Sequence, residues 1–166
     1  DEAVAVNTKV LSELFRQLID HGVYLPGCSL KSNMVNPGRD CPVSYSVDEI
    51  ARANVSTLEH TLPVSIKTAN YLSGGQCLAD AAARLSAINR ANKRGPWNLS
   101  FSWSAALQLP LLDLCRGKGG VLQLVPMRKL YIEELKMASA AANGELSCAG
   151  DEGCHVGAKK RKHTGD

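Results

Sequence analysis

The topology of this chain follows from the segment between Ile66 and Trp103, which reads IKTANYLSGGQCLADAAARLSAINRANKRGPWNLSFSW. Residues 66–72 form a β-like run, which Ser73-Gly74-Gly75 interrupts with residues typical of turns. An alanine-rich helix is expected from Leu78 to Ala91, because apolar residues recur there on one side. A polar, basic linker then leads into residues 97–103, whose alternation predicts another strand. Strand, helix and strand in this order predict a right-handed βαβ unit and hence a parallel sheet.

The sequence before this unit adds another helix, strand and helix. Apolar residues at helical spacing predict a first helix that ends at Gly22. The apolar face of that helix consists of Val10, Leu11, Leu14, Phe15, Leu18 and Ile19. The largely apolar run 29–35 suggests a buried strand. Ser46, followed three residues later by Glu49, predicts a capping box that opens the next helix.

Two further helices are expected after residue 103, over residues 104–115 and 121–142. An interior proline costs a helix ~3 kcal/mol, so Pro110 is expected to kink or break the first of them. Pro126 fits near the first turn of the second. The whole order, one helix and then three strand–helix units, predicts an α/β fold with a parallel sheet. In such sheets the functional residues gather at the carboxyl ends of the strands.

The composition of the 166 residues is that of an ordinary soluble protein, with 45% apolar and 21% charged side chains. It argues against a mainly disordered chain, and no apolar run reaches the ~20 residues of a membrane span. A formal net charge of +3 is too small to indicate a nucleic-acid partner. The six cysteines form no C-x-x-C pair and no cluster with zinc-ligand spacing. Since the N-terminus lacks a secretory signal, we expect reduced thiols in the cytosol and no metal site.

Lys31 is unusual because it interrupts the apolar pattern of the expected strand 29–35. Burial disfavours an ammonium group, so a lysine buried there would lose its proton more easily. A neutral amine can attack a ketone to form an imine, which when protonated permits a neighbouring C–C bond to break or form. The alternative is a strand-end lysine whose long stem carries its charge to solvent. The strand pattern alone favours this alternative.

Polar turns follow the other two expected strands. Ser73 and Gly74 lie between a strand and a helix, where glycine lets the backbone approach a ligand and free N–H groups attract an anion. An ordinary turn explains the same residues and is the more frequent use of Ser-Gly-Gly. Ser102 and Ser104 occupy the equivalent place after the strand over residues 97–103. Two adjacent strand ends could therefore bind one phosphate group together.

Several short blocks, spread over the first two thirds of the chain, belong to one pattern. They are Val23-Tyr24-Leu25-Pro26-Gly27, Leu30-Lys31, Asn33-Met34-Val35, Pro37-Gly38, Tyr45-Ser46, Glu49-Ile50-Ala51, Leu72-Ser73-Gly74-Gly75-Gln76, Ala87-Ile88-Asn89, Pro96-Trp97, Phe101-Ser102 and Ala106-Leu107-Gln108. In this order and spacing the sequence resembles the class I, Schiff-base fructose-bisphosphate aldolases. The resemblance runs without gaps from about Asp1 to Gln108 and fades beyond it.

The resemblance implies a (β/α)8 barrel, also called a TIM barrel, of which this chain is the C-terminal portion. Residues 1–142 would supply about three strand–helix units and the helix before them, and residues 143–166 a flexible, basic tail. The implied reaction is the glycolytic, reversible cleavage of fructose 1,6-bisphosphate to dihydroxyacetone phosphate and glyceraldehyde 3-phosphate through a lysine imine. Neither a cofactor nor a metal is expected. The implied protein is a cytoplasmic homo-oligomer, a tetramer in the family, that binds a sugar phosphate. The composition argues against a membrane or nucleic-acid partner, and a weaker third interpretation makes the basic run 159–163 a contact for nucleic acid or an acidic partner.

The site residues also follow from the resemblance. Lys31 matches the lysine that forms the imine, and Ser73 and Gly74 match positions that bind the phosphate next to the ketone. Ser102 and Ser104 fall at the other half of the same phosphate site.

Departures from the family pattern leave a second interpretation open. Ser32 replaces a proline, Pro26 an acidic residue, and Ser104-Ala105 a Gly-Arg pair. The lost guanidinium would remove charge-assisted hydrogen bonds worth ~1.5–3 kcal/mol each. The family's C-terminal tyrosine has no match, and its acid–base residues come from earlier barrel strands. The alternative is a truncated, catalytically impaired fragment that acts in binding or assembly. An open sheet edge would make such a chain marginally stable or prone to oligomerise.

Overall fold

The computed structural model describes residues 2–38, 40–115 and 122–146, which form five α-helices and three short strands. In chain order the elements are α1 (Glu2–Asp20), the 3₁₀ turn η1 (Leu25–Gly27), β1 (Ser29–Ser32), α2 (Val47–Thr61), β2 (Thr68–Tyr71), α3 (Leu78–Ala91), β3 (Asn98–Phe101), α4 (Ala105–Cys115) and α5 (Leu124–Ala142). The expected order of one helix and three strand–helix units is confirmed. None of the described helices is long and apolar enough to cross a membrane.

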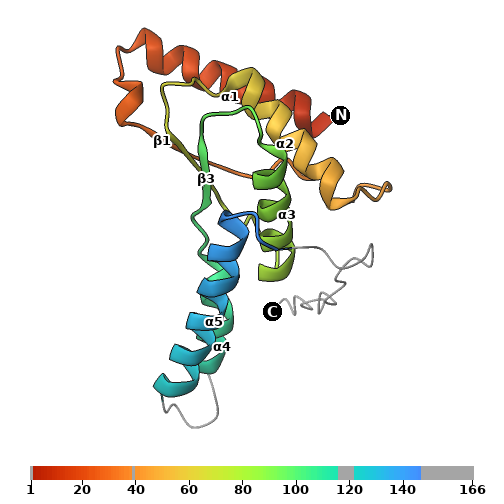
Figure 1. Cartoon of the computed structure of the whole chain (residues 1–166), viewed down its shortest axis with the longest axis vertical. Helices are drawn as coiled ribbons and strands as arrows, with labels where there is room; N and C mark the ends of the chain where they lie inside the picture. Colours follow the sequence, from red (N-terminus) through yellow and green to blue (C-terminus); the bar gives the residue numbers. More distant parts are fainter. Residues whose placement is uncertain (1, 39, 116–121, 147–166) are drawn as a thin grey trace, which may run out of the picture.

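The three strands form one parallel sheet in the order β1-β2-β3, as the βαβ pattern predicts. Helices α2 and α3 are the crossovers, and both lie on the same side of the strands in Figure 1. Helices α4 and α5 extend together away from the sheet. The sheet is not closed, so the described residues form part of a barrel-like α/β fold.

The expectation of buried strands is only half right, because burial alternates along each strand. Leu30, Ala69 and Leu99 are buried and face the helices. The positions between them carry Ser29, Lys31, Thr68, Asn70, Asn98 and Ser100, which are exposed or half-buried. A parallel sheet covered on both faces has continuous apolar strands, whereas period-two alternation is typical of a sheet with one open face. The described sheet therefore has one apolar and one polar face.

The first strand is shorter than residues 29–35, since β1 ends at Ser32. The reason is the fully buried Asn54 on α2, whose side chain forms hydrogen bonds with the backbone that follows β1. Its Oδ1 accepts a hydrogen bond from the Val35 N–H at 2.8 Å, and its Nδ2 donates to the Val35 carbonyl at 3.0 Å. Met34 and Val35 are buried even so. The apolar run thus continues into the core after the strand has ended, and the backbone of Val35 forms its hydrogen bonds with α2.

The core lies between the apolar face of the sheet and helices α2 and α3. Alanines at positions 81, 82 and 87 are buried in α3 beside Leu85 and Ile88, and their small size lets α2 and the strands approach closely. The bounds expected for this helix are confirmed. The capping box at the start of α2 is also confirmed: the Ser46 Oγ accepts from the Glu49 N–H at 3.2 Å, and Glu49 Oε2 accepts from the Ser46 N–H at 2.8 Å.

The predicted helix α1 is confirmed, but its apolar face is not buried as a whole. Leu11 and Phe15 are buried, whereas Val10 and Ile19 are each 60% exposed. At ~100° per residue the six apolar positions spread over about half the helix circumference, so those at its margins stay in solvent. Gly22 ends the helix as expected, with a φ of +66°. Its N–H donates to the Ile19 carbonyl at 2.9 Å.

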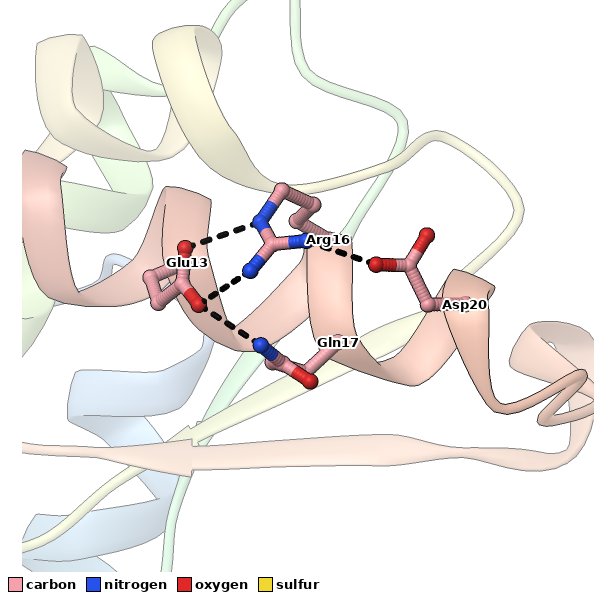
Figure 2. Close-up of polar contacts among 4 residues, drawn as sticks. All are labelled: Glu13, Arg16, Gln17 and Asp20. Carbon is pink, nitrogen blue, oxygen red and sulfur yellow. Dashed lines mark hydrogen bonds and ion pairs between the residues drawn. The ribbon is translucent and has the colours of Figure 1, made fainter.

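The exposed side of α1 carries a network of charged side chains (Figure 2). The Arg16 guanidinium donates to both carboxylate oxygens of Glu13 at 2.7 and 2.9 Å, and to Asp20 at 2.7 Å. Gln17 donates to Glu13 at 2.8 Å. These hydrogen bonds lower the pKa of Glu13 to about 2. Because all four residues are exposed and three or four positions apart on one helix, the network supports α1 and forms no cleft.

Of the kink or break expected at Pro110, the break does not occur: α4 continues through the proline to Cys115. The proline removes one backbone donor. Tertiary packing stabilises the helix despite the missing hydrogen bond, because Ala106 and Leu107 are buried and α4 contacts α5. Pro126 lies in the first turn of α5, as predicted. After α5, the Leu146 N–H donates to Ser86 Oγ at 3.0 Å, and the Leu146 carbonyl accepts from Ser86 and Arg90. The predicted basic tail lies outside the described residues from 147 onward.

Candidate functional site

The polar face of the sheet is the first part of the candidate site. The register aligns Ser29 with Thr68 and Asn98, and Lys31 with Asn70 and Ser100, in two rows. These six residues define the polar sheet face. Lys31 is the one ionisable side chain among them.

Ser29 organises this face. Its Oγ accepts hydrogen bonds from Thr68 Oγ1 at 2.8 Å and from Asn70 Nδ2 at 2.9 Å. Both donors come from β2, so these bonds link β1 and β2 on the polar side in addition to the backbone ladder. Asn70, which belongs to the same row as Lys31, thereby has its amide fixed toward the Ser29 row. Sequence reasoning missed Asn70, although polar residues at every second position of all three strands gave a signal for it.

Of the two interpretations of Lys31, the structure contradicts the buried amine and agrees with the strand-end lysine that reaches solvent, because Lys31 is an exposed residue. The pattern of β1 explains this: Leu30 points into the core, so its neighbour Lys31 points to the opposite, open face. Desolvation by an apolar strand therefore does not act on this amine within the described fold. Its position one residue before the carboxyl end of β1 agrees with the sequence-based expectation.

The backbone ladder continues beyond the ends of the strands and brings the predicted phosphate residues to one edge. The Leu72 N–H donates to the Ser32 carbonyl at 2.8 Å, and the Ser102 N–H donates to the Tyr71 carbonyl at 2.9 Å. Ser73 follows Leu72 directly, so it and Ser102 lie at neighbouring strand ends. We call residues 72–76 and 102–105 the carboxyl edge. Lys31 lies at the same edge on the next strand.

The first loop of the carboxyl edge exposes backbone rather than side chain. Ser73 is buried, while Gly74 and Gly75 are exposed and have φ values of +55° and +77°. Such φ values favour glycine. Neither glycine N–H donates to another atom of the described residues. Successive free N–H groups in a turn can bind an anion, so the loop backbone rather than the Ser73 hydroxyl is the accessible donor.

Gln76 holds this loop in place. Its Nε2 donates to the Ser73 carbonyl at 2.8 Å, and its Oε1 accepts from Arg84 Nη1 at 2.6 Å. A longer contact of 3.6 Å reaches Met34 Sδ, beyond the end of β1. Gln76 thus joins the loop both to α3 and to the segment after β1. Sequence reasoning included Gln76 only as part of the Leu-Ser-Gly-Gly-Gln block.

The second loop of the carboxyl edge leads into α4. Ser104 is exposed, and its carbonyl accepts from the Gln108 N–H at 2.8 Å, so α4 starts directly after it. Ser102 is half-buried, and its neighbour Trp103 is buried against Phe101 with ring centroids 5.0 Å apart. The first N–H groups of a helix have no helical acceptor and attract anions. Ala105 at this position adds no side-chain donor.

The remaining ionisable groups near the carboxyl edge are not arranged for catalysis. Burial raises the pKa of Tyr71, whose side chain faces the helices. Local desolvation raises the pKa of the Cys77 thiol, so this cysteine stays protonated at neutral pH and is a poor nucleophile. Within the described residues no three His, Cys, Asp or Glu side chains are close enough to hold a metal ion. The edge thus presents free backbone N–H groups next to one exposed amine.

Comparison with known proteins gives the same family for the sequence and for the fold. The model of the glycolytic class-I fructose-bisphosphate aldolases matches residues 1–163. Fructose-bisphosphate aldolase C of Rattus norvegicus is 40% identical over 148 residues, which are 89% of this chain and 40% of the rat protein. The aldolase of Echinococcus multilocularis is 44% identical over 118 residues, 71% of this chain and 32% of that protein.

A solved structure is similar as well. It is fructose-bisphosphate aldolase from Plasmodium falciparum in complex with TRAP and a small-molecule inhibitor, with a TM-score of 0.81 and 32% identity. The match covers 87% of this chain and 41% of that chain. The chain therefore spans about a third to two fifths of the length of these relatives.

Proposed function

Because the chain belongs to the family of class-I fructose-bisphosphate aldolases, we propose that it supplies the imine-forming lysine and a phosphate-binding edge to a sugar-phosphate lyase. The proposed reaction is the reversible cleavage of fructose 1,6-bisphosphate to dihydroxyacetone phosphate and glyceraldehyde 3-phosphate. The observation that carries the proposal is the position of Lys31, which shares one edge of the sheet with the free N–H groups of the loop after β2.

The proposed chemistry starts at the Lys31 Nζ. Its lone pair attacks the ketone carbon of the substrate, a C–N bond forms, and loss of water gives a protonated imine. The positive nitrogen accepts the electron pair of the adjacent C–C bond as that bond breaks. The aldehyde half leaves once its hydroxyl has given up a proton, and an enamine remains. Protonation of the enamine carbon and addition of water then release the ketone and restore the amine.

Binding of the ketone phosphate is assigned to the carboxyl edge. The backbone of Gly74 and Gly75 and the first turn of α4 would donate N–H groups from two sides, with Ser102 and Ser104 as hydroxyl donors. These donors come from adjacent strands, which lie ~4.8 Å apart in a sheet. A phosphate between them would hold the ketone beside Lys31, and such positioning is a large part of catalysis.

Borohydride trapping tests this proposal. Dihydroxyacetone phosphate and borohydride are incubated with the chain, and peptide mass spectrometry locates the reduced adduct. We expect the adduct at Lys31, and its loss in Lys31→Met. A matched control is Lys67→Met, since Lys67 is also exposed and lies directly before β2. Equal labelling of Lys67, or an unmodified Lys31 at saturating substrate, would contradict the proposed role.

A second candidate is an impaired chain that acts in binding or assembly. It is favoured by the exposed Lys31 and by a polar sheet face that offers no carboxylate to move protons. Removal of a general acid or base typically lowers a rate by 10²–10⁴-fold. This candidate predicts that fructose 1,6-bisphosphate is not cleaved even where the imine forms. Cleavage that disappears in Lys31→Met would exclude it.

We also propose the remaining properties that the family suggests. Residues 1–142 are taken as the C-terminal portion of the barrel and residues 143–166 as a basic tail, in a cytoplasmic homo-oligomer with a tetramer as the expected state. The open edges of β1 and β3 support association. Light scattering of the purified chain tests this association. A monomer with a cooperative thermal transition would contradict it.

A further inference from the structure

A polar cleft lies at the opposite end of the sheet from the carboxyl edge. It has a volume of about 290 Å³ and is formed by α2 and by the segment that connects α3 to β3. Because this segment enters β3, it lies at the amino ends of the strands. Three cationic side chains line the cleft: Arg52 from α2, and Lys93 and Arg94 from the segment. All three are exposed.

The cleft has an apolar base and a single acidic residue. Val55 is buried below it, and Ala91, the last residue of α3, is half-buried on the other wall. Ser56 and Glu59 also line the cleft from α2. Ser56 follows Arg52 by four positions and Glu59 follows Val55 by four, so these side chains share one face of that helix. The cleft therefore combines hydrogen-bonding groups and cations around a small apolar surface.

Hydrogen bonds fix the two walls of the cleft relative to one another. The indole N–H of Trp97, a buried residue, donates to the Pro63 carbonyl at 3.3 Å and joins the segment after α3 to the segment after α2. Within the α3–β3 segment, the Gly95 N–H donates to Asn92 Oδ1 at 3.2 Å. The backbone that carries Lys93 and Arg94 is thus anchored on both sides. Such preformed walls reduce the entropy lost on binding.

The cations that line the cleft are not engaged in ion pairs among the described residues. Within the described residues, Arg52, Lys93 and Arg94 form no ion pair and no side-chain hydrogen bond. Hydrogen bonds from Ser46 lower the pKa of Glu49, and Arg52 makes a smaller contribution from a distance. Helices α2 and α3 both end near the cleft, and a helix end carries a partial charge of about −0.5. Among the side chains that line the cleft, three are cationic and Glu59 is the one anion, so the lining itself carries an excess of positive charge.

We propose that this cleft binds a small compound with two phosphate groups, at a site separate from the carboxyl edge. The three cations come from two walls, so two phosphate groups can contact different cations at once. Guanidinium groups suit this role because they bind phosphate oxygens with two parallel hydrogen bonds. The volume is at the lower end for ligand clefts, which favours a small molecule over a protein segment.

The test uses pyrophosphate as the probe and orthophosphate for comparison, with titrations of the full chain followed by amide NMR shifts and by calorimetry. We expect one pyrophosphate per chain, shifts centred on Arg52 and residues 91–94, and binding several-fold tighter than that of orthophosphate. Arg52→Ala and Arg94→Ala should each weaken binding about tenfold, and Glu59→Gln should tighten it about threefold. Circular dichroism checks that each variant is folded.

Two control variants distinguish binding in this cleft from binding elsewhere on the chain. Arg128→Ala removes an exposed guanidinium on α5 and should leave binding unchanged. Lys31→Met disables the proposed imine chemistry and should also leave it unchanged, so failure of the proposed function would not affect this result. The proposal is overturned if pyrophosphate does not bind, if Arg128→Ala weakens it as much as Arg52→Ala, or if the shifts centre on the carboxyl edge.

Discussion

Lys31 of β1 lies directly opposite Asn70 of β2 in the parallel register, and both belong to the polar face of the sheet. The Asn70 amide donates to Ser29 Oγ at 2.9 Å, so the residue opposite Lys31 is neutral and its amide is fixed. A carboxylate in that place would hold the lysine as a charged ion pair, whereas an amide does not. The residue opposite Lys31 therefore offers no carboxylate with which the lysine could form an ion pair.

Asn70→Ala tests this relationship. Loss of the amide removes a hydrogen bond worth about 1 ± 0.5 kcal/mol and frees the Ser29 hydroxyl, so borohydride trapping at Lys31 should slow by about 2–10-fold. Asn98→Ala on β3 is the matched control, since Asn98 lies on the same face but not opposite Lys31. Trapping rates measured by peptide mass spectrometry compare the two. Equal rates in Asn70→Ala and the unmodified chain would show that Asn70 does not position the amine.

The sequence predicted the helices better than the strands, for a physical reason. The limits of α3 depend on local features, a turn with two glycines before it and a change to polar residues after it, and they were predicted to the residue. The end of β1 depends on a contact 19 positions away, between Val35 and Asn54. Local hydropathy carries no signal for such a contact. The strand was therefore predicted too long.

Side-chain exposure on the sheet was the larger error. The imine hypothesis relied on a buried Lys31, although the strand pattern alone favoured an exposed one and Ser29 and Lys31 alternate with Leu30. Thr68 and Asn70, and Asn98 and Ser100, repeat the pattern in β2 and β3. Period-two alternation could have predicted the polar face and Asn70 within it. No pattern in the sequence indicates the cleft with Arg52 and Arg94, because the packing of α2 against the α3–β3 segment creates it.

Asn54→Ala should lower the stability of the chain more than any surface substitution. Asn54 is fully buried and satisfies both backbone groups of Val35. Each buried group left without a partner costs about 1–3 kcal/mol, so we expect the free energy of unfolding to fall by about 2–4 kcal/mol. Urea unfolding followed by circular dichroism measures it. Asn33→Ala, an exposed position, should change it by less than about 1 kcal/mol. A loss below that value in Asn54→Ala would mean that the segment after β1 is not held by α2.

Ser46→Ala should weaken the start of α2. The Ser46 hydroxyl accepts from the Glu49 N–H, and loss of an N-cap typically costs about 1 kcal/mol. For a chain of this size the melting temperature should fall by about 2–4 °C. Thermal melting at neutral pH measures the change, with Ser12→Ala in the exposed part of α1 as the control. A melting temperature equal to that of the unmodified chain would indicate that the capping box does not limit stability.

Glu134 on α5 should make stability fall as the pH rises. The residue is buried, and its Oε2 has no hydrogen-bond partner among the described residues. Burial raises the pKa of this carboxyl above its ordinary value of 4.5. The folded chain therefore binds the proton more tightly than the unfolded chain does, and the stabilisation is fully present below about pH 4.5. It is lost as the pH rises from there through the raised pKa of the folded state.

Glu134→Gln removes this titration, so its gain in stability over the unmodified chain should be larger at pH 7.5 than at pH 4. Urea unfolding at the two pH values measures the difference between the proteins. Glu133→Gln is the matched control, because the adjacent Glu133 is exposed and should show no such dependence on pH. If the two variants respond to pH in the same way, Glu134 is charged and solvated in the folded chain, and α5 packs less closely on α3 than the buried position of Glu134 indicates.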